Sequence, residues 1–335
     1  MKKMSDWKEI ISERDTLNKK SQPKWIKPML ATLTEKRFSR ESWLFERKLD
    51  GERCLAFKKR KNVKLKSRNK KSLNKNYPEI ESALEDIPAN DFILDGEIVA
   101  FSGNLTDFSR LQDRMHVSSK KEARKTHIKV YYYVFDILYY DGYDLRKLPL
   151  RTRKKILKKV VGFKNPLRFV KHRNKEGKRF YKNACSNGWE GLIAKDAQSR
   201  YKGTRSKKWL KFKCVNQQEL VIVGFTNPEG ERKGFGALLV GYYKKNKLRY
   251  AGKIGTGYDE KTLNTLSKKL KKIEIDEKKF EGKVSKRKNA HWVKPKLVCE
   301  VEFTEWTENN KLRHHVFKGL RRDKNPKEVV KESGK

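Results

Sequence analysis

The stretch Glu46-Arg47-Lys48-Leu49-Asp50-Gly51-Glu52-Arg53 has the pattern E-x-K-x-D-G-x-R and is the most informative part of the chain. It places the amine of Lys48 beside a carboxylate, a glycine and an arginine. A lysine amine becomes a nucleophile when nearby cations and partial burial lower its pKa. Attack on the α-phosphate of a nucleotide also needs cations for the phosphate oxygens and a carboxylate for a metal. In a chain with 84 Lys and Arg residues, a solvated surface pair is the alternative, so the context decides.

The composition indicates a folded protein with a polyanionic partner. The 335 residues can bury one or two cores, and two domains are the better expectation. The net charge of +43 exceeds what solubility requires, which makes nucleic acid the leading candidate partner. A lysine-rich proteome is the alternative source of this charge. A membrane surface is disfavoured, because no basic segment is paired with a strong apolar face.

The cysteines and the apolar runs bear on the compartment. Four widely spaced cysteines form no C-x-x-C pair: Cys54, Cys185, Cys214 and Cys299. We therefore expect neither a disulfide framework nor a zinc site, which fits a reducing cytosol. The N-terminus opens no apolar run, and the most apolar stretch, 130–140, is too short to span a bilayer. These features predict a cytoplasmic protein that does not bind a membrane. If the cell is prokaryotic, we expect the protein to associate with the nucleoid.

Changes in pattern along the chain predict its organisation. Residues 1–23 are polar and basic and predict an arm or a short helix. Strand-like runs alternate with helical ones over residues 24–215, and the pattern resets near 214–219, where we place the domain boundary. Residues 216–330 combine four or five strands with one helix, which favours a small barrel of the OB type, and 331–335 form a tail. The expected fold class is α+β.

Individual elements follow from periodicity and from β-branched and aromatic residues. Helices are expected at 77–84, 150–161 and 262–273. Strands are expected at 54–57, 63–67, 92–94, 130–135, 191–195, 209–213, 220–225, 235–243, 248–254 and 297–303. The strand at 92–94 is expected to end at Asp95-Gly96. An Asp-Gly pair is the commonest hairpin turn, so a plain turn is the alternative to a functional role for this segment.

Two further segments carry carboxylates beside an apolar run. Asp95-Gly96-Glu97 directly follows Phe92-Ile93-Leu94. A carboxylate just past a buried strand is held rigidly, which suits metal or ribose binding. Glu190 and Lys195 flank the apolar run 191–194, for which an edge strand with solvated ends is the alternative.

Two more segments carry cations. Lys211 and Lys213 are two residues apart, so they share one face of a strand while Phe212 faces the core. Two amines on one face could clamp a phosphate, although an exposed alternating strand is an equal alternative. Arg321-Arg322-Asp323-Lys324 lies near the end of the chain and, taken alone, is an ordinary basic tail.

Taken in order, these segments resemble the motif series of the nucleotidyltransferase superfamily, which contains ATP-dependent DNA ligases, RNA ligases and mRNA capping enzymes. The resemblance covers roughly residues 24–330. The segments that resemble these motifs are residues 48–53 (motif I), 67–69 (motif Ia), 95–97 (motif III), 133–138 (motif IIIa), 190–191 (motif IV), 211–213 (motif V) and 321–324 (motif VI).

Within that superfamily, the chain most resembles the ligase domain of the bacterial and archaeal end-joining ligases called LigD. This resemblance rests on three longer stretches, at 108–115, 234–241 and 312–320. The chain departs from it at His315, which stands where those ligases usually carry proline. The polymerase and nuclease domains often fused to that ligase are also absent from this sequence.

The resemblance implies an adenylation domain of ATP-grasp-like antiparallel sheets with helices, followed by an OB-fold barrel. It implies an ATP-dependent DNA ligase of DNA repair or end joining. Lys48 would attack the α-phosphate of ATP, AMP would pass to the 5′-phosphate of a nick, and the 3′-hydroxyl would displace AMP. The nearest alternative is an RNA ligase or a GTP-using capping enzyme. A non-catalytic DNA-binding protein with the ligase fold is the alternative from another class.

The resemblance also implies roles for single side chains. Glu46 would read the adenine amino group, and Phe135 would stack on the base. A metal ion, Mg²⁺ or Mn²⁺, would bind Glu97 and Glu190, with Asp50 as a third ligand. These ions are hard cations that prefer oxygen ligands.

The remaining nucleotide-binding residues are mostly cations. Arg53 and Arg68 would hold the ribose side and the DNA 5′-phosphate. Lys211 and Lys213 would neutralise the α-phosphate. The other members of the nucleotide-binding set are Lys195 and, for the pyrophosphate, Arg321, Asp323 and Lys324. The last three imply a barrel that closes over the first domain and later swings away at a hinge near 214–219.

The implied partner is nicked double-stranded DNA, and the expected state is a monomer. The sequence leaves open whether Ku, or a separate end-joining polymerase or nuclease, is a partner. The six histidines show no metal-ligand spacing, so we expect structural or surface roles for them.

Overall fold

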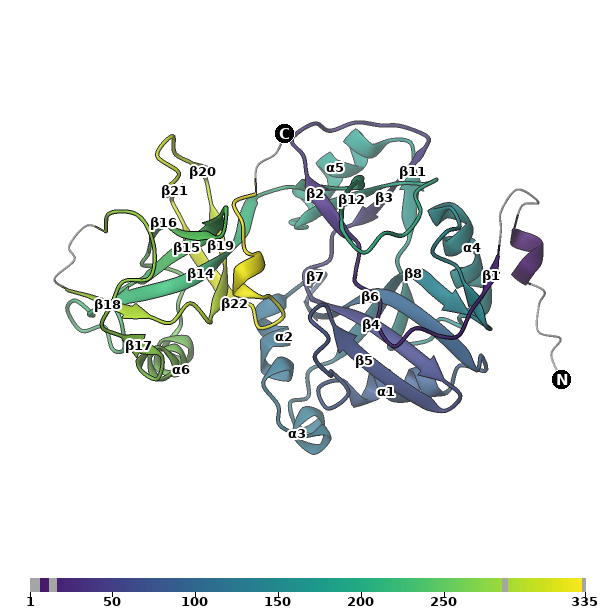
Figure 1. Cartoon of the computed structure of the whole chain (residues 1–335), viewed down its shortest axis with the longest axis horizontal. Coiled ribbons are helices and arrows are strands. Elements are labelled where there is room, and N and C mark those ends of the chain that lie inside the picture. Colours follow the sequence, from purple (N-terminus) through teal and green to yellow (C-terminus); the bar gives the residue numbers. More distant parts are fainter. Residues whose placement is uncertain (1–6, 12–16, 285–288, 333–335) are drawn as a thin grey trace. The chain divides into compact units, whose positions relative to one another are not determined.

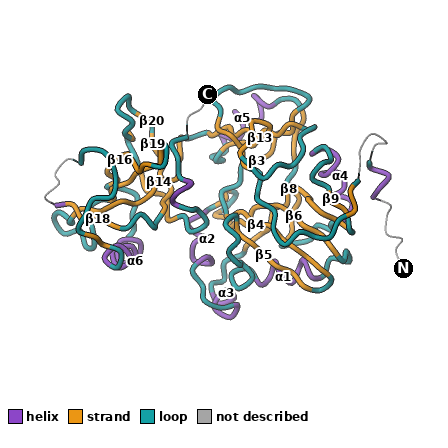
Figure 2. The backbone as a smooth tube through the Cα atoms, in the orientation of Figure 1, coloured by secondary structure: helices purple, strands orange, loops and turns teal. Residues whose placement is uncertain are grey.

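The structure is a computed structural model that describes residues 7–11, 17–284 and 289–332. It divides into two compact units, of which the first ends at Cys214 and the second begins at Val215. Strands dominate both units and helices are few (Figures 1 and 2). The expected α+β class is confirmed. Among the described residues, no helix combines the length and the apolar character needed to cross a membrane.

The first unit contains an eight-stranded sheet with the order β1-β9-β8-β6-β4-β5, in which β10 pairs with β8 and β7 with β6. Its strands are β1 (Asn18–Lys19), β4 (Glu52–Lys59), β5 (Asn62–Ser67), β6 (Asp91–Ser102), β7 (Leu105–Thr106), β8 (Val130–Tyr140), β9 (Tyr143–Asp144) and β10 (Leu167–Phe169). Apolar residues of α1 (Pro78–Glu85), α2 (Phe108–Met115) and α4 (Leu150–Val160) complete one core with this sheet. The short helix α3 (Lys120–Lys125) follows α2.

A five-stranded sheet with the order β11-β3-β12-β13-β2 forms the second layer of this unit. Its strands are β2 (Leu30–Leu33), β3 (Trp43–Arg47), β11 (His172–Asn174), β12 (Gly191–Asp196) and β13 (Arg205–Lys213). The helix α5 (Gly177–Ser186) packs on one face, where Phe180 meets Phe45, Leu192 and Phe212. The other face of this sheet therefore packs toward the eight-stranded sheet.

The inner faces of the two sheets share a core. Leu55, Ile93 and Phe135 come from the eight-stranded sheet, and Leu44 and Trp209 from the five-stranded sheet. Side chains alternate between the two faces of a strand. Residues two or four positions from these core members therefore also point into the space between the sheets, and this periodicity positions the candidate site.

The second unit is built on a seven-stranded sheet with the order β16-β15-β14-β18-β17, in which β19 pairs with β14 and β22. Its strands are β14 (Asn216–Thr226), β15 (Leu238–Lys244), β16 (Lys247–Ile254), β17 (Glu274–Ile275), β18 (Ala290–Val293), β19 (Val298–Phe303) and β22 (Val316–Leu320). The helix α6 (Glu260–Lys271) contributes Leu266 and Leu270 to the core. Two short strands, β20 (Glu305–Trp306) and β21 (Leu312–Arg313), form a separate ribbon, and a 3-10 turn η3 (Pro326–Glu328) follows. This architecture agrees with the expected OB-type domain.

The expected number of four or five strands in this unit is too low. The strands β17 and β18 have two and four residues, which is too short for a periodic pattern to be recognised. The strand β22 carries Lys318 and Gly319 between apolar residues, and both weaken its strand pattern.

The expected end of a strand at Asp95-Gly96 is wrong. The strand β6 runs through this pair from Asp91 to Ser102. A Cβ atom at position 96 would lie 2.5 Å from the ring of Tyr132 on the neighbouring strand. Gly96 is therefore required by the close packing of this ring and not by a turn.

The expected arm at 1–23 is in part packed on the first unit. The 3-10 turn η1 (Trp7–Ile10) buries Trp7, whose ring centroid lies 5.4 Å from that of Tyr140. The strand β1 pairs with β9. Residues 1–6 and 12–16 of the expected arm, and 333–335 of the expected tail, lie outside the described residues.

The expectation of no disulfide is wrong as well. Cys185 on α5 and Cys214 at the end of the first unit are joined, with their Cα atoms 5.3 Å apart. Cys54 and Cys299 are buried free thiols. The pairing was not predictable from spacing, because 29 residues separate two cysteines that the fold brings together.

We predict that denatured, non-reduced protein exposes two alkylatable thiols, Cys54 and Cys299, and that reduction exposes four. The mass of the intact protein after iodoacetamide treatment measures both numbers. Reduction before unfolding should also lower stability, by roughly 3 kcal/mol for a loop of this length. Four alkylated cysteines without a reductant would contradict the pairing. The Cys185→Ser variant is the control, since it should expose Cys214 without reduction.

Candidate nucleotide-binding site

Lys48 lies where the chain passes from one sheet to the other. It follows the last residue of β3 in the five-stranded sheet, and β4 of the eight-stranded sheet begins at Glu52. Gly51 makes this crossing possible, because a Cβ atom there would collide with the carbonyl oxygen of Ile98. The backbone N–H of Lys48 donates to the carbonyl of Gly191 at 2.9 Å, which fixes the loop to β12.

The side chain of Lys48 forms an ion pair with Glu190. The Lys48 side chain is 19% exposed and that of Glu190 is 7% exposed, so the pair lies at the edge of the interior. The predicted nucleophile and a predicted metal ligand are thus in direct contact. A half-buried ammonium beside a carboxylate is held at a defined position, which a group-transfer reaction needs.

Strand register brings four other predicted residues to the same inner face. Glu46 on β3 is opposite Ile193 on β12, which in turn is opposite Lys211 on β13. Lys213 is opposite Gly191, and Lys195 is opposite Trp209. Because opposite residues of an antiparallel pair share a face, the four predicted residues on this inner face are Glu46, Lys195, Lys211 and Lys213.

Glu46 is buried between two lysines. Its two carboxylate oxygens lie 2.5 Å from Nζ of Lys154 and 2.6 Å from Nζ of Lys195. Burial by itself would raise the pKa of Glu46, but the two ammonium groups outweigh it and hold the pKa below its usual value. Burial lowers the pKa of Lys195 to about 8 despite the charge of Glu46. Glu46 is therefore an anionic acceptor of hydrogen bonds at neutral pH.

Phe135 supplies an aromatic ring beside these charges. Its ring centroid lies 4.0 Å from Nζ of Lys195 and 4.5 Å from the guanidinium carbon of Arg53. The indole of Trp209 meets the same ring edge-on, with centroids 6.1 Å apart. The ring is 7% exposed, and both cations lie within the distance of a cation–π contact.

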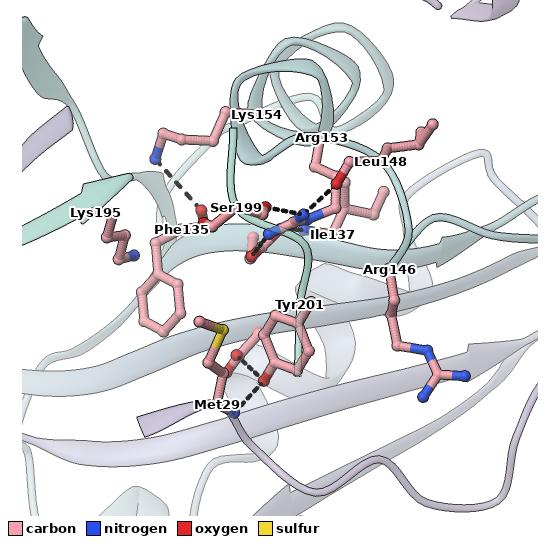
Figure 3. Close-up of polar contacts among 12 residues, drawn as sticks. Met29, Phe135, Ile137, Arg146, Leu148, Arg153, Lys154, Lys195, Ser199 and Tyr201 are labelled. Carbon is pink, nitrogen blue, oxygen red and sulfur yellow. Dashed lines mark hydrogen bonds and ion pairs between the residues drawn. The ribbon is translucent and has the colours of Figure 1, made fainter. Parts of the chain in front are cut away.

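Arg53 is anchored to Asp95 rather than left mobile. Two of its nitrogens donate to the two carboxylate oxygens of Asp95, both at 2.6 Å. The hydroxyl of Tyr201 donates to Asp95 at 2.6 Å and accepts from the backbone N–H of Met29 at 3.0 Å (Figure 3). Burial opposes the charged form of Arg53, but Asp95 outweighs burial and raises the pKa of Arg53 above its usual value. Asp95 therefore orients a cation and is not available to a metal.

Two of the three predicted metal ligands, Glu190 and Asp50, lie near Lys48. Glu190 carries a buried oxygen, Oε2, that finds no hydrogen-bond partner within the described part of the chain. A buried carboxylate oxygen is a ligand that a hard divalent cation prefers, so this atom fits a metal. Glu97 on β6 is opposite Arg53 on β4, and Asp50 lies in the Lys48 loop. The residues that the structure describes contain no group of three His, Cys, Asp or Glu side chains arranged as a metal site.

The other predicted residues lie elsewhere in the fold. Arg68 lies in the turn after β5, one residue beyond the pair formed by Ser67 and Cys54. The remaining three belong to the second unit, where Arg321 pairs with Glu300 at 2.7 Å and with Asp323 at 3.0 Å. Lys324 pairs with Glu219 at 2.8 Å. Each of these ion pairs is formed within the second unit.

Three residues at this site were missed by the sequence reasoning: Lys154, Trp209 and Tyr201. Trp209 lies two residues before Lys211 on a strand that we had predicted, so its face could have been inferred. Lys154 is one of several lysines in a basic helix, and no sequence signal distinguishes it.

We predict that Glu46→Gln destabilises the protein strongly, because two buried ammonium groups would lose their counter-charge. Removing one partner of a buried ion pair costs about 3–5 kcal/mol. For a domain of this size, that corresponds to a fall in Tm of roughly 10 °C. Scanning calorimetry of the full chain measures this fall in Tm.

The matched control is Glu41→Gln. Glu41 pairs with Lys175 at 2.7 Å, with side chains that are 75% and 65% exposed, so the same chemical change should leave Tm unaltered. Equal shifts in the two variants would contradict the account of Glu46.

The comparisons with known proteins agree with this geometry. A family model for the ATP dependent DNA ligase domain matches residues 28–213, and one for the ATP dependent DNA ligase C terminal region matches residues 231–324. The multifunctional non-homologous end joining protein LigD of Pseudomonas aeruginosa is 35% identical over 318 residues, which are 92% of this chain and 37% of that protein. A DNA ligase of Sulfophobococcus zilligii is 33% identical over 282 residues, which are 78% of this chain and 46% of that protein.

A solved structure agrees as well. The structure of mycobacterial DNA ligase D complexed with ATP and MES matches 91% of this chain and 98% of that chain, with a TM-score of 0.65 and 34% identity. The chain spans less than half the length of the two curated relatives. Two family models in sequence and a matching fold lead to one conclusion: this chain belongs to the ATP-dependent DNA ligase family.

Proposed function

We propose that this chain is a DNA ligase that uses ATP to seal nicks between a 5′-phosphate and a 3′-hydroxyl, in DNA repair or end joining. The supporting observation is the contact between Lys48 and Glu190 at the point where the two sheets meet. Lys211 and Lys213 share one face of β13, and Lys213 is opposite Gly191, whose carbonyl accepts from the backbone N–H of Lys48. The relatives' family and this arrangement support the same reaction.

In the first step, Nζ of Lys48 forms a bond to the α-phosphorus of ATP, and the bond to the pyrophosphate oxygen breaks. The amine must be neutral to attack, so Nζ of Lys48 passes one proton to Oε1 of Glu190 before the N–P bond forms, and a second proton leaves to solvent as that bond forms. Lys211 and Lys213 neutralise the α-phosphate oxygens. Apart from the bond formed by Lys48, positioning with charge neutralisation provides most of the catalysis.

A divalent metal would be held by Glu97 and Glu190, with Asp50 as a third oxygen ligand. When bound, such an ion supplies positive charge to the phosphate oxygens of the nucleotide. Arg53 and Arg68 hold the ribose side and later the 5′-phosphate of the nick. Both steps with DNA then repeat the same chemistry: AMP passes to the 5′-phosphate, and the 3′-hydroxyl displaces it.

The high positive charge supports duplex DNA as the substrate, since phosphate contacts by Lys and Arg dominate such binding. End joining also implies partners, and we propose Ku, or a separate end-joining polymerase or nuclease, in that role. Co-sedimentation of the ligase with Ku on blunt duplex ends tests this. Sedimentation that is independent of Ku would remove the proposal.

We predict that ATP labelled at the α-phosphate leaves its label on the wild-type protein and not on Lys48→Ala, with a loss of at least a hundredfold. GTP labelled in the same way should leave none. A chase with nicked duplex should release AMP and give sealed DNA. Denaturing gels measure both products.

The control variant is Lys125→Ala, an exposed lysine on α3 of the same unit, which should keep full labelling. Pretreatment with pyrophosphate removes AMP that is already attached to the purified protein. Labelling of Lys48→Ala after this treatment would refute the assignment of the nucleophile. Transfer of label to an RNA 5′-diphosphate, with none to nicked DNA, would indicate a capping enzyme.

We further propose a hinge at 214–219 between an adenylation domain over 24–215 and an OB-fold domain over 216–330. Arg321, Asp323 and Lys324 of the second unit orient the pyrophosphate in the first step, and DNA must occupy the same region afterwards. The two units therefore take different separations in the two states.

We predict that dyes at Lys121→Cys on α3 and Lys268→Cys on α6 report different distances with ATP and with nicked DNA, as measured by single-molecule energy transfer. Both positions are exposed. Dyes at Lys121→Cys and Lys178→Cys lie in the same unit and should report one distance throughout. An unchanged distance for the first pair would rule out the hinge.

A further inference from the structure

Lys154 is a buried lysine that none of the ligase-like motifs contains. It lies on α4, and its side chain is 2% exposed. A buried ammonium is unfavourable unless all of its N–H groups find acceptors. The identity of those acceptors therefore indicates what the residue does.

The ammonium of Lys154 donates to three acceptors on different segments. They are Oε1 of Glu46 at 2.5 Å, the carbonyl of Phe135 at 3.3 Å and the carbonyl of Val170 at 3.1 Å. Figure 3 shows the contact from the helix to Phe135. An ammonium has three donors, so this set uses all of them. Two of the three acceptors belong to the residues that we expect to contact the nucleobase.

The preceding residue locks the helix in this register. Arg153 is fully buried and donates to both carboxylate oxygens of Asp136, at 2.7 and 2.8 Å. It also donates to the carbonyls of Leu148 and Ser199, at 2.6 and 3.0 Å (Figure 3). Asp136 follows Phe135 directly on β8. Two neighbouring cations of α4 thus hold two neighbouring residues of β8, and Lys154 cannot shift without breaking both sets of bonds.

We propose that Lys154 is a positioning residue for nucleobase recognition: it fixes the carboxylate of Glu46 and the backbone of Phe135 in the one arrangement that accepts a hydrogen bond from the 6-amino group of adenine. The inference rests on the proposed function. A carboxylate has about four acceptor sites, and the two lysines use two of them. An anionic acceptor favours the amino group of adenine and disfavours the 6-oxygen of guanine, which is itself an acceptor.

The experiment compares ATP with purine riboside triphosphate, which differs only by lacking the 6-amino group. Formation of the lysyl-nucleotide adduct is measured as kcat/KM for both compounds, in the wild type and in Lys154→Met. The wild type should prefer ATP by roughly tenfold to a hundredfold, the value of one hydrogen bond to a charged group. In Lys154→Met this preference should fall to about threefold or less, because kcat/KM falls for ATP and changes little for the analogue.

Lys155→Met is the matched control. Lys155 is the next residue on α4 and is exposed, so the same substitution should leave the preference unaltered. A purely structural role for Lys154 would lower kcat/KM equally for both compounds, and that result would overturn the proposal. If Lys154→Met does not fold, Lys154→Arg decides, because it keeps the charge and loses the compact ammonium geometry. A preference in Lys154→Arg equal to that of the wild type would then overturn the proposal.

The failure of this inference can be told from the failure of the proposed function. A wild type that forms no adduct with ATP, even after treatment with pyrophosphate, would refute the function itself. A wild type that forms the adduct, with an ATP preference that survives Lys154→Met, would refute only the role of Lys154.

Discussion

The buried carboxylate of Glu46 joins three parts of the chain that are far apart in sequence. Its oxygens contact Lys154 on α4 and Lys195 on β12, while its own backbone belongs to β3. Three charges removed from water are stable only if they meet in good geometry, so β3, β12 and α4 must all be in place together. One extra positive charge remains in this cluster.

The two sheets bring the candidate site residues together around Glu46. Strand alternation directs Glu46, Lys195 and Lys211 from one sheet toward Arg53 and Phe135 of the other. The loop that crosses between the sheets carries Lys48. Lys48, the proposed nucleophile, is therefore positioned by the same crossing that closes the core. This explains why a short motif contains both this lysine and Gly51, which a close backbone approach requires.

Much of this arrangement could be predicted from the sequence, because it depends on periodicity. The two-residue spacing of Lys211 and Lys213 correctly predicted their shared face. The helix α3 was missed although Ser119 and Glu122 have the spacing of a capping box, and the Ser119 hydroxyl accepts from the Glu122 N–H at 3.2 Å. Lys154 and the Cys185–Cys214 pair could not have been found in this way, since each depends on contacts between distant segments.

The disulfide has a mechanical consequence for the end of the first unit. It ties Cys214 to α5, and the backbone N–H of Cys214 donates to the carbonyl of Glu190 at 3.0 Å. The hydroxyl of Tyr181 on α5 donates to the carbonyl of Lys213 at 3.0 Å. The strand that carries Lys211 and Lys213 is thus joined, up to its last residue, to Glu190, the ion-pair partner of Lys48. Within the proposed hinge at 214–219, bending must therefore begin at Val215 or beyond, because Cys214 is held by these bonds. Such motion leaves the spacing between Lys213 and Glu190 unchanged.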